Sequence, residues 1–97
     1  TQLEKNKLAA AKEARRLNGP QESRFPSGKI RSRWTNVNGE MSGKFIGYNE
    51  TGKIKTDCDY AQGKPEGLCL TYDDEGRLDK RETWKSGKMV KEETFYD

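Results

Sequence analysis

The feature that most constrains the fold is an internal repeat of 24 residues. Six glycines recur at this interval in two series, Gly28, Gly52 and Gly76, and Gly39, Gly63 and Gly87. Three tyrosines keep the same spacing: Tyr48, Tyr72 and Tyr96. A fixed period without gaps indicates a row of similar supersecondary units, each of which packs mainly against its neighbours.

Each unit has the pattern of a β-hairpin. In the middle unit, strands are predicted over residues 53–60 and 67–72, and the polar segment AQGK joins them. The segments NETG and DDEG join one unit to the next. Both kinds of connection place a glycine where a type I turn followed by a left-handed residue needs one, so we predict that turn at all of them.

This turn sets which residues share a face of the sheet. With Gly63 in the left-handed position, residue 60 lies opposite 64 and residue 58 lies opposite 66. The even-numbered face then collects most large apolar side chains: Ile54, Cys58, Tyr60, Leu68, Leu70, Tyr72, Leu78 and Trp84. The odd-numbered face is charged: Arg31, Arg33, Lys55, Asp57, Asp59, Asp79 and Arg81. We expect Asp57 and Asp59 to pair with Arg33, Arg81 or lysines on neighbouring strands.

The predicted fold is therefore mainly β, an antiparallel meander of three hairpin units at about 25–48, 49–72 and 73–96, within a repeat region of residues 19–97. Residues 1–18 are rich in helix formers and end at Asn18-Gly19-Pro20, which predicts a capping helix. Its narrow apolar stripe is predicted to cover either the end of the sheet or its apolar face: Leu3, Ala10, Ala14 and Leu17. Residues from Gly19 onward match the second half of a preceding unit, whose first strand the helix replaces.

The cysteines and the aromatic residues each leave two alternatives. The register above points Cys58 to the apolar face and Cys69 to the other, which favours a free, buried Cys58 over a disulfide. The aromatic side chains are expected to form the core, because small sheets need large rings to bury enough area. The alternative is a partly open concave surface lined by Trp34, Tyr60 and Trp84.

Composition argues against catalysis and against a cofactor. The chain contains no histidine, the commonest general base and metal ligand, and two cysteines are too few for a zinc site. The acidic segment YDDEG lacks the spaced ligands of an EF-hand and fits an inter-unit turn. We predict no catalytic, cofactor or metal site, and no apolar run approaches the roughly 18 residues of a membrane span.

Charge is unevenly distributed along the chain. Residues 1–18 carry five basic and two acidic side chains, whereas the repeats carry fourteen of each sign. A basic helix suits nucleic acid or an anionic surface, but no interleaving of arginine with aromatic residues accompanies it. A solvated capping helix is therefore favoured, and nucleic acid is disfavoured as a partner.

The whole pattern resembles the variant MORN repeat. The features that carry the resemblance are Gly-Lys-Ile or Gly-Arg-Leu, an aromatic residue, a Gly-Lys turn, a glycine and a closing tyrosine, over about residues 19–96. The first unit departs from it, because Asn36 stands where the later units have Tyr60 and Trp84. The resemblance implies stacked hairpins that form a scaffold for binding. Such repeats occur in many bacterial proteins, including ones similar to the antitoxin component of toxin–antitoxin modules.

We therefore expect a non-catalytic module that binds another protein, with a toxin encoded nearby as the most specific partner. The predicted partner-binding residues are Arg31, Arg33, Trp34, Lys55, Asp57, Asp59, Asp79 and Arg81. The alternative is an envelope-associated or lipoprotein-derived structural module. The compartment stays open between cytoplasm and envelope, since a start at Thr1 is consistent with a removed leader. The terminal strand leaves an edge that allows pairing with a second copy.

Overall fold

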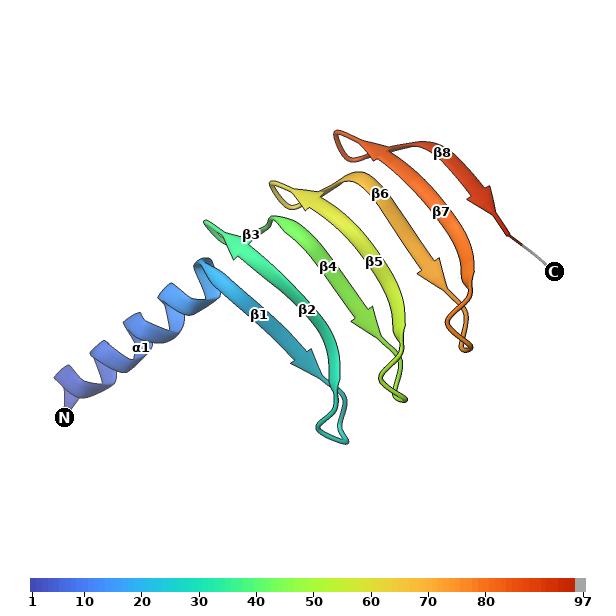
Figure 1. The fold of residues 1–97 in the computed structure, drawn as a ribbon. Helices are drawn as coiled ribbons and strands as arrows, with labels where there is room; N and C mark the ends of the chain where they lie inside the picture. Colours follow the sequence, from blue (N-terminus) through green and yellow to red (C-terminus); the bar gives the residue numbers. More distant parts are fainter. Residues whose placement is uncertain (96–97) are drawn as a thin grey trace.

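The protein is a single antiparallel sheet with a helix at its N-terminal end (Figure 1). This computed structural model describes residues 1–95, apart from the side chains of residues 8, 9, 11 and 12; Tyr96 of the repeat lies outside the described residues. The helix is α1 (Gln2–Leu17), and the strands are β1 (Gly19–Arg24), β2 (Ile30–Val37), β3 (Glu40–Met41), β4 (Gly43–Tyr48), β5 (Ile54–Ala61), β6 (Lys64–Tyr72), β7 (Leu78–Lys85) and β8 (Lys88–Thr94). They lie in the order β1-β2-β4-β5-β6-β7-β8, and β3 pairs with β2. The predicted mainly-β meander with an N-terminal helix is confirmed.

The helix begins and ends where its capping residues predict. The Thr1 side chain accepts a hydrogen bond from the Glu4 amide while the Glu4 side chain returns to Thr1, which is a capping box. At the other end, Asn18 is extended, with φ −139° and ψ 136°, and leads the chain directly into β1. The helix consequently projects beyond the β1 edge of the sheet (Figure 1).

The expectation that the apolar stripe of the helix covers the sheet is wrong. Leu3 is 64% exposed and Leu17 is 37% exposed, and Ala10 and Ala14 are exposed as well. The last turn of the helix is attached to the sheet, because the Leu17 carbonyl accepts a hydrogen bond from the Gly39 amide at 2.7 Å. The same bond recurs one and two units later, from Gly63 to Met41 and from Gly87 to Pro65. The end of the helix thus takes the place of a strand in the repeat, as predicted, whereas the described side chains of its earlier turns are exposed.

The turns that join one unit to the next have the predicted geometry. After β4, the Asn49 amide donates to the Lys53 carbonyl at 2.9 Å, and the Gly52 amide donates to the Asn49 carbonyl at 3.0 Å. The Asn49 side chain also accepts from two backbone amides of the turn, and Asp73 does the same one unit later. The predicted pairings beside these turns are confirmed: Tyr48 with Ile54, and Tyr72 with Leu78.

The turns within each unit differ from the prediction. Ala61 pairs with Lys64, so only Gln62 and Gly63 form the loop, and both have left-handed φ angles of 52° and 78°. Two successive left-handed residues are the mark of a type I′ turn, whose twist matches that of the flanking strands. The three-residue turn predicted at these places is therefore wrong.

A bulge after the type I′ turn decides which side chains share a face. Between the Tyr60–Pro65 and Cys58–Cys69 pairs, β5 advances by two residues while β6 advances by four. Together with the shorter turn, this places Cys58 opposite Cys69 rather than opposite residue 66. The prediction that all even-numbered residues share a face is consequently wrong for β6: Leu68, Leu70 and Tyr72 lie on the face opposite Cys58, Tyr60 and Trp84.

The same change of register brings the two cysteines together. Cys58 and Cys69 lie directly opposite each other on β5 and β6 and form a disulfide. The predicted free Cys58 is therefore wrong as to its bonding, although Cys58 is buried, with 4% of its surface exposed. The bond links the two strands at the middle of the sheet.

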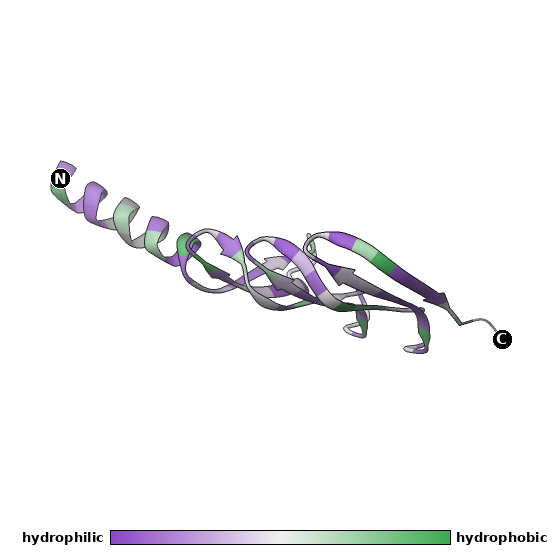
Figure 2. Cartoon of the chain, turned by 90° about the horizontal axis from the view of Figure 1, so that it is seen from above, coloured by the Kyte–Doolittle hydropathy of each residue, from purple (hydrophilic) through white to green (hydrophobic). Residues whose placement is uncertain are grey.

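The sheet is one layer thick and has almost no interior. The molecule measures 61 × 34 × 13 Å, and in the view from above no described segment covers either face of the sheet (Figure 2). Trp34, Tyr60 and Trp84 are only half-buried, so the alternative of an open aromatic surface describes them better than a core does. Among the described residues, no helix has the length and apolar character needed to cross a membrane.

Candidate binding faces of the sheet

Four of the eight predicted partner-binding residues lie on one face of the sheet. We name it the charged face and define it by Arg33, Asp57, Asp59 and Arg81. Opposite residues of antiparallel strands point to the same side, and the pairings run across the sheet from Arg33 through Ile46, Asp57 and Leu70 to Arg81. Charged and apolar side chains therefore alternate along this row.

Lys44, which the sequence pattern did not single out, holds the two acidic residues of the charged face. Its Nζ lies 3.2 Å from a carboxylate oxygen of Asp57 and 3.2 Å from one of Asp59. The neighbouring Asp59 carboxylate, followed by that of Asp57, raises the pKa of Lys44 above its ordinary value. The expected pairing of these carboxylates with a lysine of a neighbouring strand is confirmed.

The two arginines of the charged face have different surroundings. Arg81 donates to the Glu93 carboxylate at 2.8 Å and lies 5.8 Å from the centre of the Phe95 ring. The bond from Arg81 lowers the pKa of Glu93. No carboxylate of the described residues pairs with Arg33, which lines two shallow hollows of about 610 and 470 Å³. Arg33 is thus the arginine of this face that can pair with a carboxylate from outside.

The other charged residues of the predicted set occupy bulges. In each unit the strand pairing skips one residue beside the inter-unit turn, and the skipped residues are Arg31, Lys55 and Asp79. Arg31 Nε donates to Ser23 Oγ at 3.4 Å, and Ser23 is hydrogen bonded to Ser32 on the face opposite the charged one. The bulges therefore separate these residues from the odd-numbered row in which the sequence pattern had placed them.

The opposite face carries both tryptophans, and we name it the aromatic face: Trp34, Phe45, Tyr60 and Trp84. The ring centres of Trp34 and Phe45 are 5.9 Å apart, and the Tyr60 ring meets Phe45 edge-to-face at 6.0 Å. Such pairs add about 0.5–1.5 kcal/mol beyond the area that they bury. Trp34, the eighth residue of the predicted set, thus lies on the face opposite Arg33.

Phe45 is the member of the aromatic face that the sequence did not reveal. It lies directly opposite Cys58, so it shares that residue's face in spite of its odd number. The signal was available in the alternation along β4, where Phe45 and Gly47 point to one side and Lys44 and Ile46 to the other. Only the pairing of β4 with β5 shows which of these two sets lies on the aromatic face and which on the charged face.

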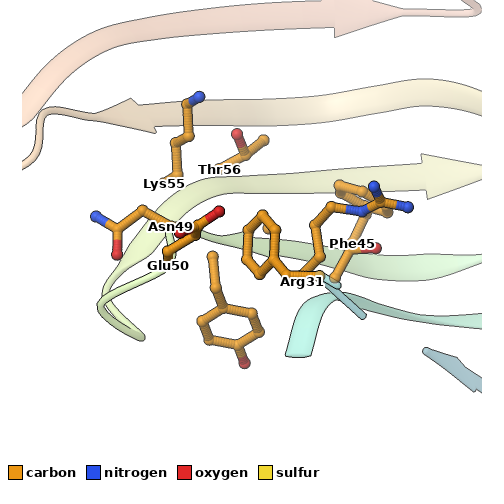
Figure 3. Close-up of a pocket in the computed structure, with 10 residues that line it drawn as sticks. Arg31, Phe45, Asn49, Glu50, Lys55 and Thr56 are labelled. Atoms are coloured by element: carbon orange, nitrogen blue, oxygen red, sulfur yellow. The ribbon is translucent and has the colours of Figure 1, made fainter. Parts of the chain in front are cut away.

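A hollow of about 490 Å³ opens on the aromatic face beside the Phe45 ring. It is lined by residues from β2, β4 and β5, among them Arg31, Gly47, Lys55 and Thr56 (Figure 3). Arg31 and Lys55 extend from different strands at opposite sides of this hollow (Figure 3). A surface with this shape and composition is suited to binding a side chain of another molecule.

Comparison with known proteins adds no relative. No protein-family model matches the chain, and no curated protein or solved structure matches it significantly. Within the part of the chain that the structure describes, no group of three or more carboxylate or thiol side chains is arranged to hold a metal ion. The likeness to the variant MORN repeat therefore rests on the sequence pattern.

Proposed function

We propose that this chain is a non-catalytic repeat module whose sheet binds another protein. Its most specific form is an immunity or antitoxin protein of the variant MORN type that neutralises a cognate toxin. The observation that carries the proposal is the single-layer sheet, 13 Å in its shortest dimension, with half-buried aromatic rings on one face and alternating charged and apolar residues on the other.

The physical reason is that such a sheet leaves its apolar side chains in contact with water. Each Å² of apolar surface removed from water contributes about 25 cal/mol, and within residues 1–95 no element covers either face. Aromatic residues and arginine are the side chains that most often dominate protein interfaces. Separate positive and negative positions on the charged face add selectivity for a partner of complementary charge.

The test uses the product of the gene adjacent to the one that encodes this chain. Titration calorimetry would measure its affinity for the wild type and for Arg33→Glu, since no carboxylate within the described part of the chain forms an ion pair with Arg33. We expect the substitution to weaken binding by about 30-fold or more, the range of an interface hot spot. Lys85→Glu is the control, because Lys85 carries the same charge at an exposed position at the end of β7.

Two outcomes separate the parts of this proposal. Equal affinity of the wild type and Arg33→Glu would remove the charged face from the interface while leaving a protein-binding role in place. Co-expression adds the biological readout: the wild-type chain should restore growth to cells that produce the adjacent gene product. Continued growth arrest, together with undetectable binding, would contradict the antitoxin role.

The disulfide favours a second candidate, an envelope-associated structural module without a toxin partner. Disulfides such as Cys58–Cys69 persist in oxidising compartments and are rare in the reducing cytoplasm. Cell fractionation of the producing organism, followed by thiol labelling of the intact protein, would test this candidate. Recovery in the cytoplasmic fraction with both thiols free would count against it, and recovery in the envelope with the bond formed would support it.

A further inference from the structure

We propose that the hollow above Gly47 is an anchor site that receives an aromatic side chain flanked by carboxylates from the partner protein. This inference deepens the proposed function and rests on it. It concerns the aromatic face, whereas the charge-reversal experiment above concerns the charged face.

Gly47 differs from every other glycine of the chain. Nine of the ten glycines have positive φ angles, which only glycine adopts readily, whereas Gly47 does not. Crowding does not require a glycine there either, because a Cβ atom would lie 3.4 Å from Thr56 Cβ and 3.7 Å from Phe45 Cε1, both ordinary contact distances. A glycine inside a strand weakens it and often marks a place where a ligand approaches closely.

What the glycine leaves on the surface is the hollow itself. Its volume of about 490 Å³ lies within the range of roughly 300–1,000 Å³ that binding pockets occupy. Gly47 and the half-buried Phe45 line the hollow. The bulge residues Arg31 and Lys55 stand at its sides (Figure 3). An aromatic side chain can pack against Phe45 from this position.

The charges beside the hollow indicate the sign of the partner. Arg31 donates only to a serine hydroxyl, and no carboxylate of the described residues pairs with Lys55. Glu50 also lines the hollow and bears the opposite charge, so the site offers two cations against one anion. Carboxylates that flank an aromatic anchor would meet these two cations, and they would repel a basic segment.

The next unit of the repeat lacks this combination of a strand glycine and two basic bulge residues. One unit later, Thr71 stands in the position of Gly47, and Asp79 stands in the position of Lys55. A β-branched side chain therefore occupies the equivalent space, and the two bulge residues beside it have opposite charges. The hollow is thus a local departure from the repeat, which is where a repeat scaffold gains specificity.

Three short peptides provide probes that do not depend on knowing the partner. They are blocked pentapeptides with the central sequences Asp-Phe-Asp, Lys-Phe-Lys and Asp-Ala-Asp, titrated into the isotope-labelled full chain while amide shifts are followed by NMR. We expect Asp-Phe-Asp to shift the amides of Gly47, Thr56 and Arg31, with smaller shifts from the other two. Equal shifts from all three peptides, or shifts confined to other regions, would overturn the proposal.

The matched variant fills the hollow without disturbing the strand. Gly47→Thr introduces the residue found one unit later, and threonine is the better strand former, so the variant should fold at least as well as the wild type. We expect it to bind the Asp-Phe-Asp peptide about tenfold more weakly, while Thr71→Val, on the same face in the next unit, should leave binding unchanged. Unchanged binding by Gly47→Thr would refute the anchor site.

The partner itself separates failure of this inference from failure of the proposed function. If the adjacent gene product binds the wild type and Gly47→Thr equally well, the proposed function stands and the anchor site is wrong. If single-stranded nucleic acid, added at low salt, shifts the same amides more strongly than the acidic peptide, the hollow is an anion site of a different class and the proposal is wrong.

Discussion

The second hairpin (β5–β6) and the third (β7–β8) follow the same 24-residue pattern but pair their strands differently. In the second, Gly67 has a φ of 94° and accompanies a two-residue bulge. In the third, Lys91 stands in its place, and β8 gains only one residue on β7 between the Thr83–Lys91 and Trp84–Met89 pairs. The size of the bulge, and with it the register of the strand that follows, therefore differs between the two hairpins.

The consequence of this difference is visible in the side chains. Cys58 meets Cys69 in the second hairpin, and the same repeat positions in the third hold Glu82 and Glu93. Because the bulge is one residue shorter there, Glu93 lies opposite Arg81 and pairs with it rather than facing Glu82. The shorter bulge thus adds an ion pair on the charged face, whereas Glu82 lies opposite Glu92 on the other face, where Lys80 Nζ is 3.7 Å from the Glu82 carboxylate and 3.9 Å from that of Glu92.

The largest expected effect comes from removing the covalent bond of the second hairpin. The disulfide closes a loop with a sequence separation of 11 residues, and the loop-entropy relation gives about 3 kcal/mol of stabilisation. We expect Cys58→Ser/Cys69→Ser to lower the free energy of unfolding by about this amount, measured by urea titration with circular dichroism. Addition of a thiol reductant should lower the midpoint of the wild type and leave that of the double variant unchanged. Equal urea midpoints of the wild type and the double variant would show that the disulfide does not stabilise the second hairpin relative to the third.

A smaller loss is expected when the bulge glycine of the second hairpin is given a side chain. Gly67→Ala forces a Cβ onto a residue with left-handed φ, at a cost of about 1–2 kcal/mol. Gly47→Ala is the matched control, since the φ angle of Gly47 is not positive and alanine should stabilise the strand by about 0.5–1 kcal/mol. Urea unfolding of both variants measures the contrast. Opposite signs are expected, and the same sign for both would contradict the role of φ at Gly67.

A still smaller gain is expected from the type I′ turn of the third hairpin. Ser86 has a φ of 52°, a conformation that asparagine tolerates better than serine, and the first hairpin has Asn38-Gly39 at this place. Ser86→Asn should raise the free energy of unfolding by about 0.5 kcal/mol, and the reverse change Asn38→Ser should lower it by a similar amount. Thermal unfolding of the two variants would measure these opposite changes, and a loss of stability in Ser86→Asn would contradict the prediction.

These contrasts also explain which parts of the fold the sequence predicted. The spacing of the glycines located the strands, and the inter-unit turns followed from their glycine position. The strongest hairpin dipeptide, Asn38-Gly39, pointed to a two-residue turn, but Gln62-Gly63 and Ser86-Gly87 carry that signal only weakly. Since one turn was predicted for all three units, the register within each hairpin was predicted wrongly.

The binding faces depend on that register, so they were predicted less well than the strands. Alternation along a strand shows which of its residues point to the same face of the sheet. It does not show which residues of the neighbouring strand point to that face as well. A bulge of two residues leaves the parity set by the turn unchanged and a bulge of one reverses it, whereas the predicted register contained no bulge within the hairpins. Lys44 and Phe45 were therefore missed, and Arg31 and Lys55 were assigned to the charged row although they belong to bulges.

The smallest expected effect concerns the turns that precede these two hairpins, Asn49 before the second and Asp73 before the third. Both side chains accept hydrogen bonds from the backbone of their turn, but only Asp73 can be protonated. The hydrogen bond from the Arg77 amide lowers the pKa of the Asp73 carboxyl. A carboxyl whose pKa is lower in the folded state stabilises that state above its unfolded pKa, and this contribution disappears as the pH falls through the folded value. We therefore expect the urea midpoint of the wild type to decrease below about pH 4, and Asp73→Asn, which copies Asn49, to decrease less. Identical acid dependence in the two proteins would mean that the Asp73 turn, like the Asn49 turn, contributes nothing that depends on protonation.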